Sequence, residues 1–397
     1  MQRHSSSTFY QAHELLAAAR DLRPVLEAAA AETELHGALP QVILDALHEA
    51  RLFRMLLPAS VGGLETPPAV FIEVVEALAS ADCSIAWVVA QGCGCSLSAA
   101  YLAPDAAQEV FGARDAVLAW GPSGTGATAR AADDGYIVTG KWHFASGNRH
   151  AQWLGGHCTL IEADGQPRRD AAGKPIERTA IFPRAAARIE GDWNVIGLKG
   201  TGSDSYSVNE LFVPAKRTYR REAADERREN GPLYQFSGMT MFAFGISAMA
   251  LGIARTMLDA FLEVAKSKSE RTTGRPLRDS GVIQAEIAKC EARLAASRLL
   301  MLTTARETYA LAGDGRSFTP ELRARMRLST TWATAEARAV ADFAYTAAGA
   351  QAIFAGGPFE RRFRDIHTLT QQVQAHAANF ELVGQALLGV ASNSRLL

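Results

Sequence analysis

The sequence predicts an α+β protein in which strands lie between two helical regions. Apolar side chains recur every three or four residues from about position 10 to 110, change to a period of two between 116 and 214, and return to the helical spacing from Tyr234 onward. The length of 397 residues is enough for two or three domains. We therefore expect a helical domain over residues 1–115, a β domain over 116–232 and a helical domain over 233–397.

The first region is expected to contain several helices. An apolar stripe covers positions 15–29, and a second stripe ends before the proline-rich loop at 58–68. A largely apolar helix is predicted from Val70 to about Ser80, and another from Ser84 to Leu102. The latter contains the small residues GCGC at 92–95, which either let two helices approach closely or leave room for a ligand.

The central region favours a small barrel or sandwich. Strands are predicted at 117–120, 135–146, 153–161, 178–182 and 208–213. Short strands of this kind, separated by Gly, Asp and Pro, are typical of barrels and sandwiches. The third region predicts a four-helix bundle, with long helices at 239–266, 280–311, 320–349 and 363–396.

A hairpin is expected within 135–146. Thr139-Gly140 predicts its turn, and its second strand begins at Trp142. Because side chains alternate along a strand, Trp142, Phe144 and Ser146 are expected to share one face. An aromatic plane and a hydroxyl are what a flat heteroaromatic cofactor needs. An ordinary amphipathic hairpin with Phe144 in a core explains the same pattern.

Composition excludes several classes of function. The net charge is −1 and charged residues make up 21%, so no basic surface for nucleic acid is indicated. The five cysteines lack zinc spacing, and His143, His150 and His157 have no accompanying carboxylate, so we expect no metal. No signal peptide is visible, and no apolar run reaches the length of about 18 residues that a membrane span needs. A cytoplasmic protein is expected.

The order of the three regions and several motifs resemble the acyl-CoA dehydrogenase superfamily. The motifs are WGPSGTGA at 120–127, KWHFAS at 141–146 and LKGTGSDS at 198–205. The resemblance implies a flavin stacked on Phe144, with Ser146 hydrogen-bonded near the N5 edge, and usually a homotetramer. It also implies further cofactor-binding residues, namely Trp120, Pro122, Ser123, Gly124 and Thr125 in the flavin loop, with Arg271 and Gln284 reaching the cofactor of a neighbouring subunit.

The glutamate base of the dehydrogenases is not found in either of its usual places. Nine residues after Arg364, where many relatives have it, the chain has Val373, and the stretch from Tyr234 to Gly252 contains no acid. The step Arg364-Asp-Ile-His367 instead resembles the two-component aromatic hydroxylases of the superfamily. That resemblance implies reduced FAD or FMN from a separate NAD(P)H-dependent reductase, O2 as co-substrate, a C4a-hydroperoxide, and a phenol- or indole-like substrate.

The resemblance assigns catalytic roles to Ser146 and His367. Ser146 would hydrogen-bond the flavin, and His367 would exchange a proton with the substrate, although a histidine satisfied by Asp365 or solvent explains the same residue. The expected substrate pocket contains Trp87, Cys95, Phe242 and His367, and Cys95 stands where several hydroxylases have histidine. N- or S-oxygenation, an acyl-CoA dehydrogenase with an unrecognised base, and a non-catalytic assembly protein remain alternatives.

Overall fold

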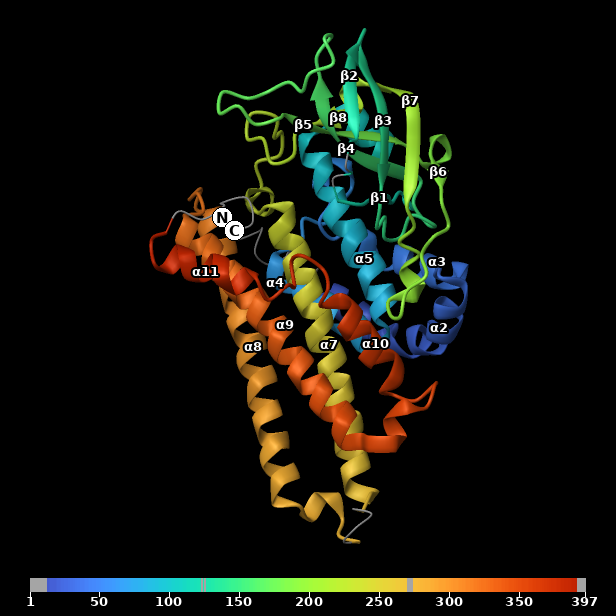
Figure 1. Ribbon diagram of the computed structural model, residues 1–397, viewed down its shortest axis with the longest axis vertical. Helices are drawn as coiled ribbons and strands as arrows, with labels where there is room; N and C mark the ends of the chain where they lie inside the picture. The colour runs from blue at the N-terminus through green and yellow to red at the C-terminus, as the bar shows by residue number, and fades with distance from the viewer. Residues whose placement is uncertain (1–12, 123, 125, 270–273, 391–397) are drawn as a thin grey trace.

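The strands lie at one end of the molecule and the long helices at the other (Figure 1). The computed structural model describes residues 13–122, 124, 126–269 and 274–390. Before the strands come α2 (Arg23–His36), α3 (Gln41–Glu49), α4 (Pro68–Ala81), α5 (Cys83–Ser96) and α6 (Pro104–Phe111). The predicted helices at 70–80 and 84–102 correspond to α4, and to α5 with the 3-10 turn η3 (Leu97–Tyr101) that continues it.

The strands of the described chain form one mixed sheet. They are β1 (Leu118–Trp120), β2 (Thr128–Ala132), β3 (Gly135–Trp142), β4 (Trp153–Ile161), β5 (Glu177–Pro183), β6 (Arg188–Ile189), β7 (Tyr206–Pro214) and β8 (Thr218–Tyr219). The order is β6-β7-β3-β2-β4-β5-β8, and β1 also pairs with β4. Both β1 and β2 run parallel to β4, β1 along its first residues and β2 along its last. The glycine-rich loop at 121–127 therefore leaves the sheet between two strands that share one neighbour.

The predicted turn at Thr139-Gly140 is wrong. β3 continues through these residues, and the pairing of β3 with β7 shifts register between Val138 and Gly140, which is a bulge. The hairpin is formed by β2 and β3, and its turn lies at Asp133-Asp134, where Asp134 has a left-handed φ of 57°. The Asp-Asp-Gly sequence at 133–135 is a stronger hairpin signal than Thr139-Gly140, since Asp tolerates the left-handed conformation of a two-residue turn.

The expected common face of Trp142, Phe144 and Ser146 is also wrong, because the strand ends at Trp142. The Trp142 ring lies in the core of the sheet, stacked on Tyr206 with ring centroids 5.2 Å apart. Phe144, with a φ of 64°, is 60% exposed. Phe144 lies two residues beyond the end of β3 and is left-handed, so its ring is not held on the buried face that Trp142 occupies.

The C-terminal region contains α7 (Gly238–Ser267), α8 (Gly281–Gly313), α9 (Pro320–Ala348), α10 (Glu360–Leu369) and α11 (Asn379–Leu387). The single helix predicted over 363–396 is wrong, because α10 and α11 are separated. Asn379 stabilises the break, since its side-chain amide donates to the carbonyl oxygens of Val373 at 3.0 Å and Gln374 at 3.2 Å. α4 packs against α7, so the N-terminal region joins the bundle.

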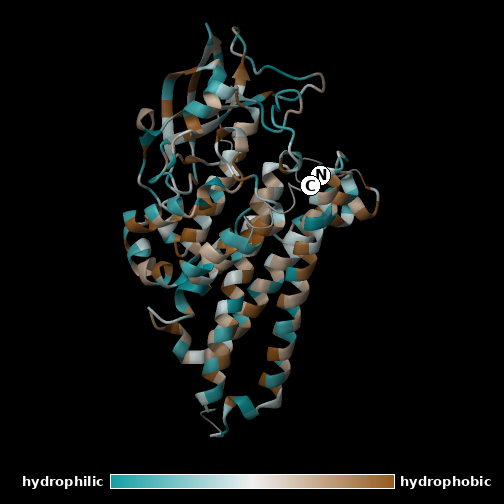
Figure 2. Ribbon diagram, turned by 180° about the vertical axis from the view of Figure 1, so that it is seen from behind, coloured by the Kyte–Doolittle hydropathy of each residue, from teal (hydrophilic) through white to brown (hydrophobic). Residues whose placement is uncertain are grey.

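Two helical segments are apolar and long enough to cross a membrane by length and composition, Cys83–Tyr101 and Gly238–Ser267. Their apolar windows are 94% and 83% buried inside the molecule. Burial of this extent is typical of core helices. The outer helices of the bundle instead mix hydrophilic and hydrophobic residues along their length (Figure 2).

Candidate functional site

α5 connects the predicted cofactor site with a cavity. It begins at Cys83 because the carboxylate of Asp82 accepts a hydrogen bond from the Ile85 N–H at 3.0 Å. Trp87 and Gly94 lie seven positions apart, so they share one face of the helix about 10 Å apart. Trp87 contacts the chain that leaves β3, and Gly94 contacts the first turns of α7. One helix face therefore spans both parts of the site.

The structure brings Trp87 and Ser146 together. Nε1 of Trp87 donates a hydrogen bond to Oγ of Ser146 at 2.8 Å, and Oγ of Ser203 lies 2.8 Å from the same oxygen. Ser146 is only partly buried, whereas Trp87 and Ser203 are buried. The hydroxyl is thus held by two buried side chains, while Ser146 itself is partly exposed.

Phe144 presents an aromatic face beside this hydroxyl. The ring of Trp193 meets it edge-on, with centroids 6.2 Å apart and an interplanar angle of 89°. Trp193 also lines an open recess of about 530 Å³. A Cβ on Gly121 would lie 1.7 Å from the carbonyl oxygen of His143, so the glycine-rich loop packs directly on the segment that carries Phe144. The recess is lined by the end of α2 and by residues 193–199, and not by Phe144 or Ser146. The exposed ring and the hydroxyl held beside it fit the face and edge of a flavin.

The other predicted cofactor residues do not all lie near Phe144 and Ser146. Trp120 ends β1, and Pro122 and Gly124 belong to the loop that packs against the end of β3. Ser123, Thr125 and Arg271 lie outside the described residues. Gln284 is in the first turn of α8, where its amide donates to the Arg278 carbonyl at 2.8 Å. This end of α8 is far from the sheet (Figure 1).

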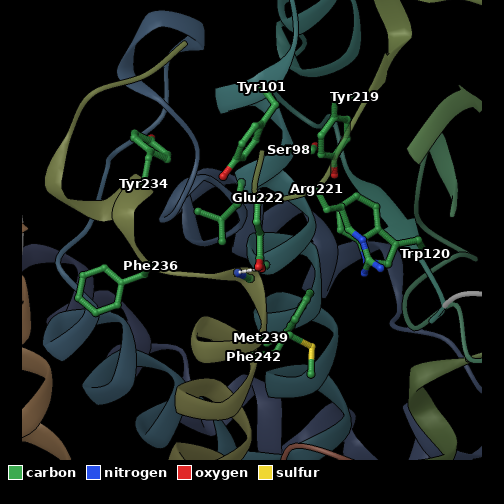
Figure 3. Close-up of a pocket in the computed structure, with 13 residues that line it drawn as sticks. Ser98, Tyr101, Trp120, Tyr219, Arg221, Glu222, Tyr234, Phe236, Met239 and Phe242 are labelled. Atoms are coloured by element: carbon green, nitrogen blue, oxygen red, sulfur yellow. Dashed lines mark hydrogen bonds between the residues drawn. The ribbon is translucent and has the colours of Figure 1, made fainter. Parts of the chain in front are cut away.

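A cavity of about 60 Å³ lies between the C-terminal part of α5, β1 and the start of α7. Trp120, Phe236, Met239 and Phe242 contribute apolar surface, and Tyr101 and Tyr219 contribute stacked phenol rings 5.5 Å apart. Figure 3 shows the Glu222 side chain running from the side of these rings toward the start of α7, where its carboxylate accepts the Gly238 N–H at 3.0 Å. The cavity is therefore aromatic, with polar groups at the ends of its side chains.

Of the four residues grouped as a substrate pocket, only Phe242 lines this cavity. A Cβ on Gly94 would lie 2.1 Å from the Phe242 ring, so the small residues of α5 serve the close approach of α7. Trp87 is engaged with Ser146. Cys95 is buried in an apolar cluster with Leu118, and this burial raises the pKa of its thiol, as expected for packing.

His367 lies on α10 and bonds a different carboxylate from the one expected. Its Nε2 is 2.8 Å from Oδ1 of Asp342 on α9, and its ring packs on Phe363 with centroids 4.4 Å apart. Both His367 and Asp342 are about one third exposed. With a proton on Nε2 donated to Asp342, the Nδ1 lone pair is left as the basic position.

Asp365, next to His367 in sequence, anchors the loop that carries Ser203. Its Oδ1 accepts the Leu198 N–H at 2.6 Å, and Leu198 itself has a left-handed φ of 54°. Burial, together with the negative charge of Asp82, raises the pKa of Asp365 to about 7, although the Leu198 amide, Arg361 and Arg364 oppose the shift. This buried carboxyl is held by a backbone amide, as expected for a structural role.

The three central histidines each have a separate partner. His143 Nδ1 lies 2.7 Å from Ser205 Oγ, His157 Nδ1 lies 2.8 Å from Thr179 Oγ1, and His150 Nε2 accepts the Leu39 N–H at 2.9 Å. Burial lowers the pKa of His150 to about 4, consistent with a neutral ring that accepts. Among the described residues, no group of three His, Cys, Asp or Glu side chains could hold a metal ion.

Sequence reasoning missed the polar part of the cavity. Tyr219 ends β8, Arg221 and Glu222 follow it in a charge-rich stretch that resembles a solvated connection, and Tyr101 ends η3. The tyrosines were the available signal, since phenol rings in a charged connection usually have a buried partner. Only the fold shows that the connection returns to α5.

Comparison with known proteins identifies the family of this chain. Residues 244–378 match the family described as "Acyl-CoA dehydrogenase, C-terminal domain". The HsaA oxygenase subunit of a flavin-dependent monooxygenase from Rhodococcus jostii is 31% identical, with 90% of this chain and 92% of the relative covered. The indole-3-acetate monooxygenase of Acinetobacter baumannii is 28% identical, with 91% of each chain covered. The HsaA crystal structure from Mycobacterium tuberculosis superposes with a TM-score of 0.87 at 27% identity, covering 97% of this chain and all of that one.

The fold and site define a flavoenzyme with the acyl-CoA dehydrogenase architecture. A TM-score of 0.89 to XiaF, described in complex with FADH2, shows the same fold at 23% identity over 98% of both chains. The chain belongs to the flavin-dependent monooxygenases, as an oxygenase that uses reduced flavin.

The buried Asp365 predicts a pH-dependent stability. Its pKa is raised from 3.8 to about 7, so between these values the folded chain holds a proton that the unfolded chain has released. The free energy of unfolding therefore falls as pH rises toward 7 and levels off above it. Asp365→Asn cannot titrate, so chemical unfolding at pH 5 to 8 should show its stability rising relative to the parent by about 3 kcal/mol over this range.

The matched control is Asp259→Asn, at a carboxylate 61% exposed on α7. Its stability should stay parallel to that of the parent at every pH. Parallel curves for Asp365→Asn as well would show that the Asp365 carboxyl does not titrate in this range.

Proposed function

We propose that the enzyme hydroxylates a small aromatic or heteroaromatic compound of the phenol or indole type. The observation that carries the proposal is the aromatic cavity beside Gly94, which lies on the same face of α5 as the Trp87 that bonds Ser146. Flat apolar rings favour stacking on Trp120 and Phe242, and the tyrosine hydroxyls suit a substrate hydroxyl or ring N–H. The names of relatives specify indole-3-acetate and resorcinol as their substrates, which supports this class.

Phe144, Ser146 and the loop that starts at Trp120 are proposed to hold the flavin. When bound, reduced FAD or FMN supplies the activation of O2. The exposed Phe144 ring would support one face of the flavin, and the Ser146 hydroxyl would hydrogen-bond its N5 edge. α5 and the loop from Gly197 to Asp204 back this pair and keep bulk water out from the interior side.

His367 on α10 is not part of the lining of the cavity between α5, β1 and α7, and it is proposed to exchange a proton with the substrate at the edge of that site. Support comes from its bond to Asp342, which fixes the ring and leaves Nδ1 free to accept. The dehydrogenase alternative lacks comparable support, because Val373 has no carboxylate and Glu222 already caps the first turn of α7.

We further propose a soluble cytoplasmic homotetramer supplied by a separate NAD(P)H-dependent reductase. The names of relatives, oxygenase subunit and oxygenase component, support a second protein. Exposed Val282 and Leu299 on α8 and Trp332 on α9 support contacts between copies. Gln284 is proposed to reach the cofactor of another subunit, together with Arg271.

Ser146→Ala should uncouple flavin oxidation from hydroxylation. The variant loses the hydroxyl that is proposed to bond the flavin beside Phe144. The fraction of reduced-flavin oxidation that releases free hydrogen peroxide should therefore rise severalfold, as expected for the loss of one directed hydrogen bond. Peroxide and hydroxylated product are quantified in single turnovers. Ser96→Ala is the control, because this buried serine on α5 donates only to its own helix at 2.7 Å. Equal coupling in both variants contradicts the role of Ser146.

His367→Ala should slow hydroxylation by about 10²-fold while flavin affinity is unchanged, because general acid–base catalysis contributes about that much. Asp342→Asn should lower the rate less, since the ring remains but its tautomer is no longer fixed. His376→Ala removes an exposed histidine from the connection before α11 and serves as the control. Single-turnover rates with saturating flavin measure the effect. A parental rate in His367→Ala would refute the assignment.

A further inference from the structure

Four side chains form a continuous hydrogen-bonded series behind the proposed flavin site. Trp87 Nε1 donates to Ser146 Oγ at 2.8 Å, Ser146 Oγ lies 2.8 Å from Ser203 Oγ, and Ser203 Oγ lies 2.7 Å from Thr201 Oγ1. Thr201 Oγ1 then donates to the carbonyl oxygen of Leu198 at 2.8 Å. Ser203 and Thr201 are buried, so water does not complete their hydrogen bonding.

Counting protons gives this series a direction. A carbonyl oxygen only accepts, so the single proton of Thr201 is used at Leu198. The bond between Thr201 and Ser203 must then be donated by Ser203, and its proton is also used. Ser146 must consequently donate to Ser203. Each hydroxyl has one proton, so the direction is fixed along the whole series.

Ser146 is left with one unused lone pair. The indole N–H of Trp87 can only donate, so it occupies one of the two lone pairs of the Ser146 oxygen. The proton of Ser146 points to Ser203. Because Ser146 is partly exposed beside Phe144, its remaining polar position faces outward as an acceptor.

The far end of the series cannot easily turn. Leu198 is held in its left-handed conformation by the bond from its N–H to Asp365. Gly202, with a φ of 49°, packs so closely that a Cβ would lie 2.5 Å from the carbonyl oxygen of Gly37. The loop is therefore fixed against α10 on one side and the end of α2 on the other. Reversal of the series would remove the Thr201 hydroxyl from the Leu198 carbonyl, which would keep the longer bonds from Trp193 Nε1 and the Thr201 N–H, both at 3.2 Å.

Reduced and oxidised flavins differ in the group they offer at N5. The reduced ring has an N–H, which donates, and the oxidised ring has a lone pair, which accepts. We propose that Thr201 and Ser203 are positioning residues that make Ser146 a hydrogen-bond acceptor, so that the site prefers reduced flavin over oxidised flavin. The inference rests on the proposed position of Ser146 at the N5 edge.

The preference is measurable without turnover. The dissociation constants of oxidised and of anaerobically reduced FAD and FMN are determined by titration of the purified protein. Ser203→Ala and Thr201→Val release the Ser146 proton at two different points. The preference is expressed as the dissociation constant of oxidised flavin divided by that of reduced flavin. Each variant should lower this ratio about tenfold, which is the value of one directed hydrogen bond. For a two-electron couple this equals about 30 mV in the midpoint potential of the bound flavin.

Conservative variants distinguish the effect of hydrogen-bond direction from the effect of altered side-chain packing. Ser203→Thr and Thr201→Ser keep the hydroxyls and should keep the parental ratio, and Ser96→Ala controls for loss of a buried hydroxyl elsewhere. Thermal unfolding verifies that each variant is folded. If Ser146→Ala lowers the ratio but Ser203→Ala and Thr201→Val do not, the series does not set the direction and the inference is wrong. If Ser146→Ala also leaves the ratio unchanged, both the inference and the proposed place of Ser146 fail.

Discussion

The hydrogen bond from Trp87 to Ser146 joins the two halves of this molecule at the site. α5 is buried at every residue except Gln91, so its position is set by packing on all sides. Ser146 belongs to the turn that follows β3 and is carried by the sheet. A contact between a rigid helix and a rigid sheet fixes a small hydroxyl far more accurately than a loop alone. The cavity lies beside the C-terminal part of the same helix face, so its position relative to Ser146 is also fixed.

Direction matters as much as position in such a site. A serine hydroxyl can donate or accept, and in water it changes freely between the two. Here the buried Thr201 and Ser203 use their protons in sequence, which removes that freedom from Ser146. Leu198, whose carbonyl oxygen accepts the Thr201 hydrogen bond, is in turn bonded through its N–H to Asp365 on α10. The same helix also carries His367. Both proposed catalytic residues therefore depend on the same small region between the sheet and the bundle.

The periodicity of the sequence predicted the layers, because helices and strands of this length bury one face over many residues. It failed where single residues decide the path. Phe144 is left-handed two residues after β3 ends, and the hairpin turn lies at Asp133-Asp134 and not at Thr139-Gly140. Phe144 and Ser146 were identified by resemblance, and Ser146 bonds Trp87. The tyrosines of the cavity could not be grouped, because only the tertiary fold brings η3 and the connection after β8 together.

The central claim is that the chain binds reduced flavin and protects it from simple reoxidation. The direct measurement is anaerobic binding of chemically reduced FAD, and separately FMN, followed by rapid mixing with oxygenated buffer while oxidised flavin absorbance is recorded. The account predicts a lag before the absorbance of oxidised flavin appears. It also predicts that a phenol or indole changes the length of this lag. Immediate reoxidation at the rate of free flavin, with no lag for either cofactor, would contradict it.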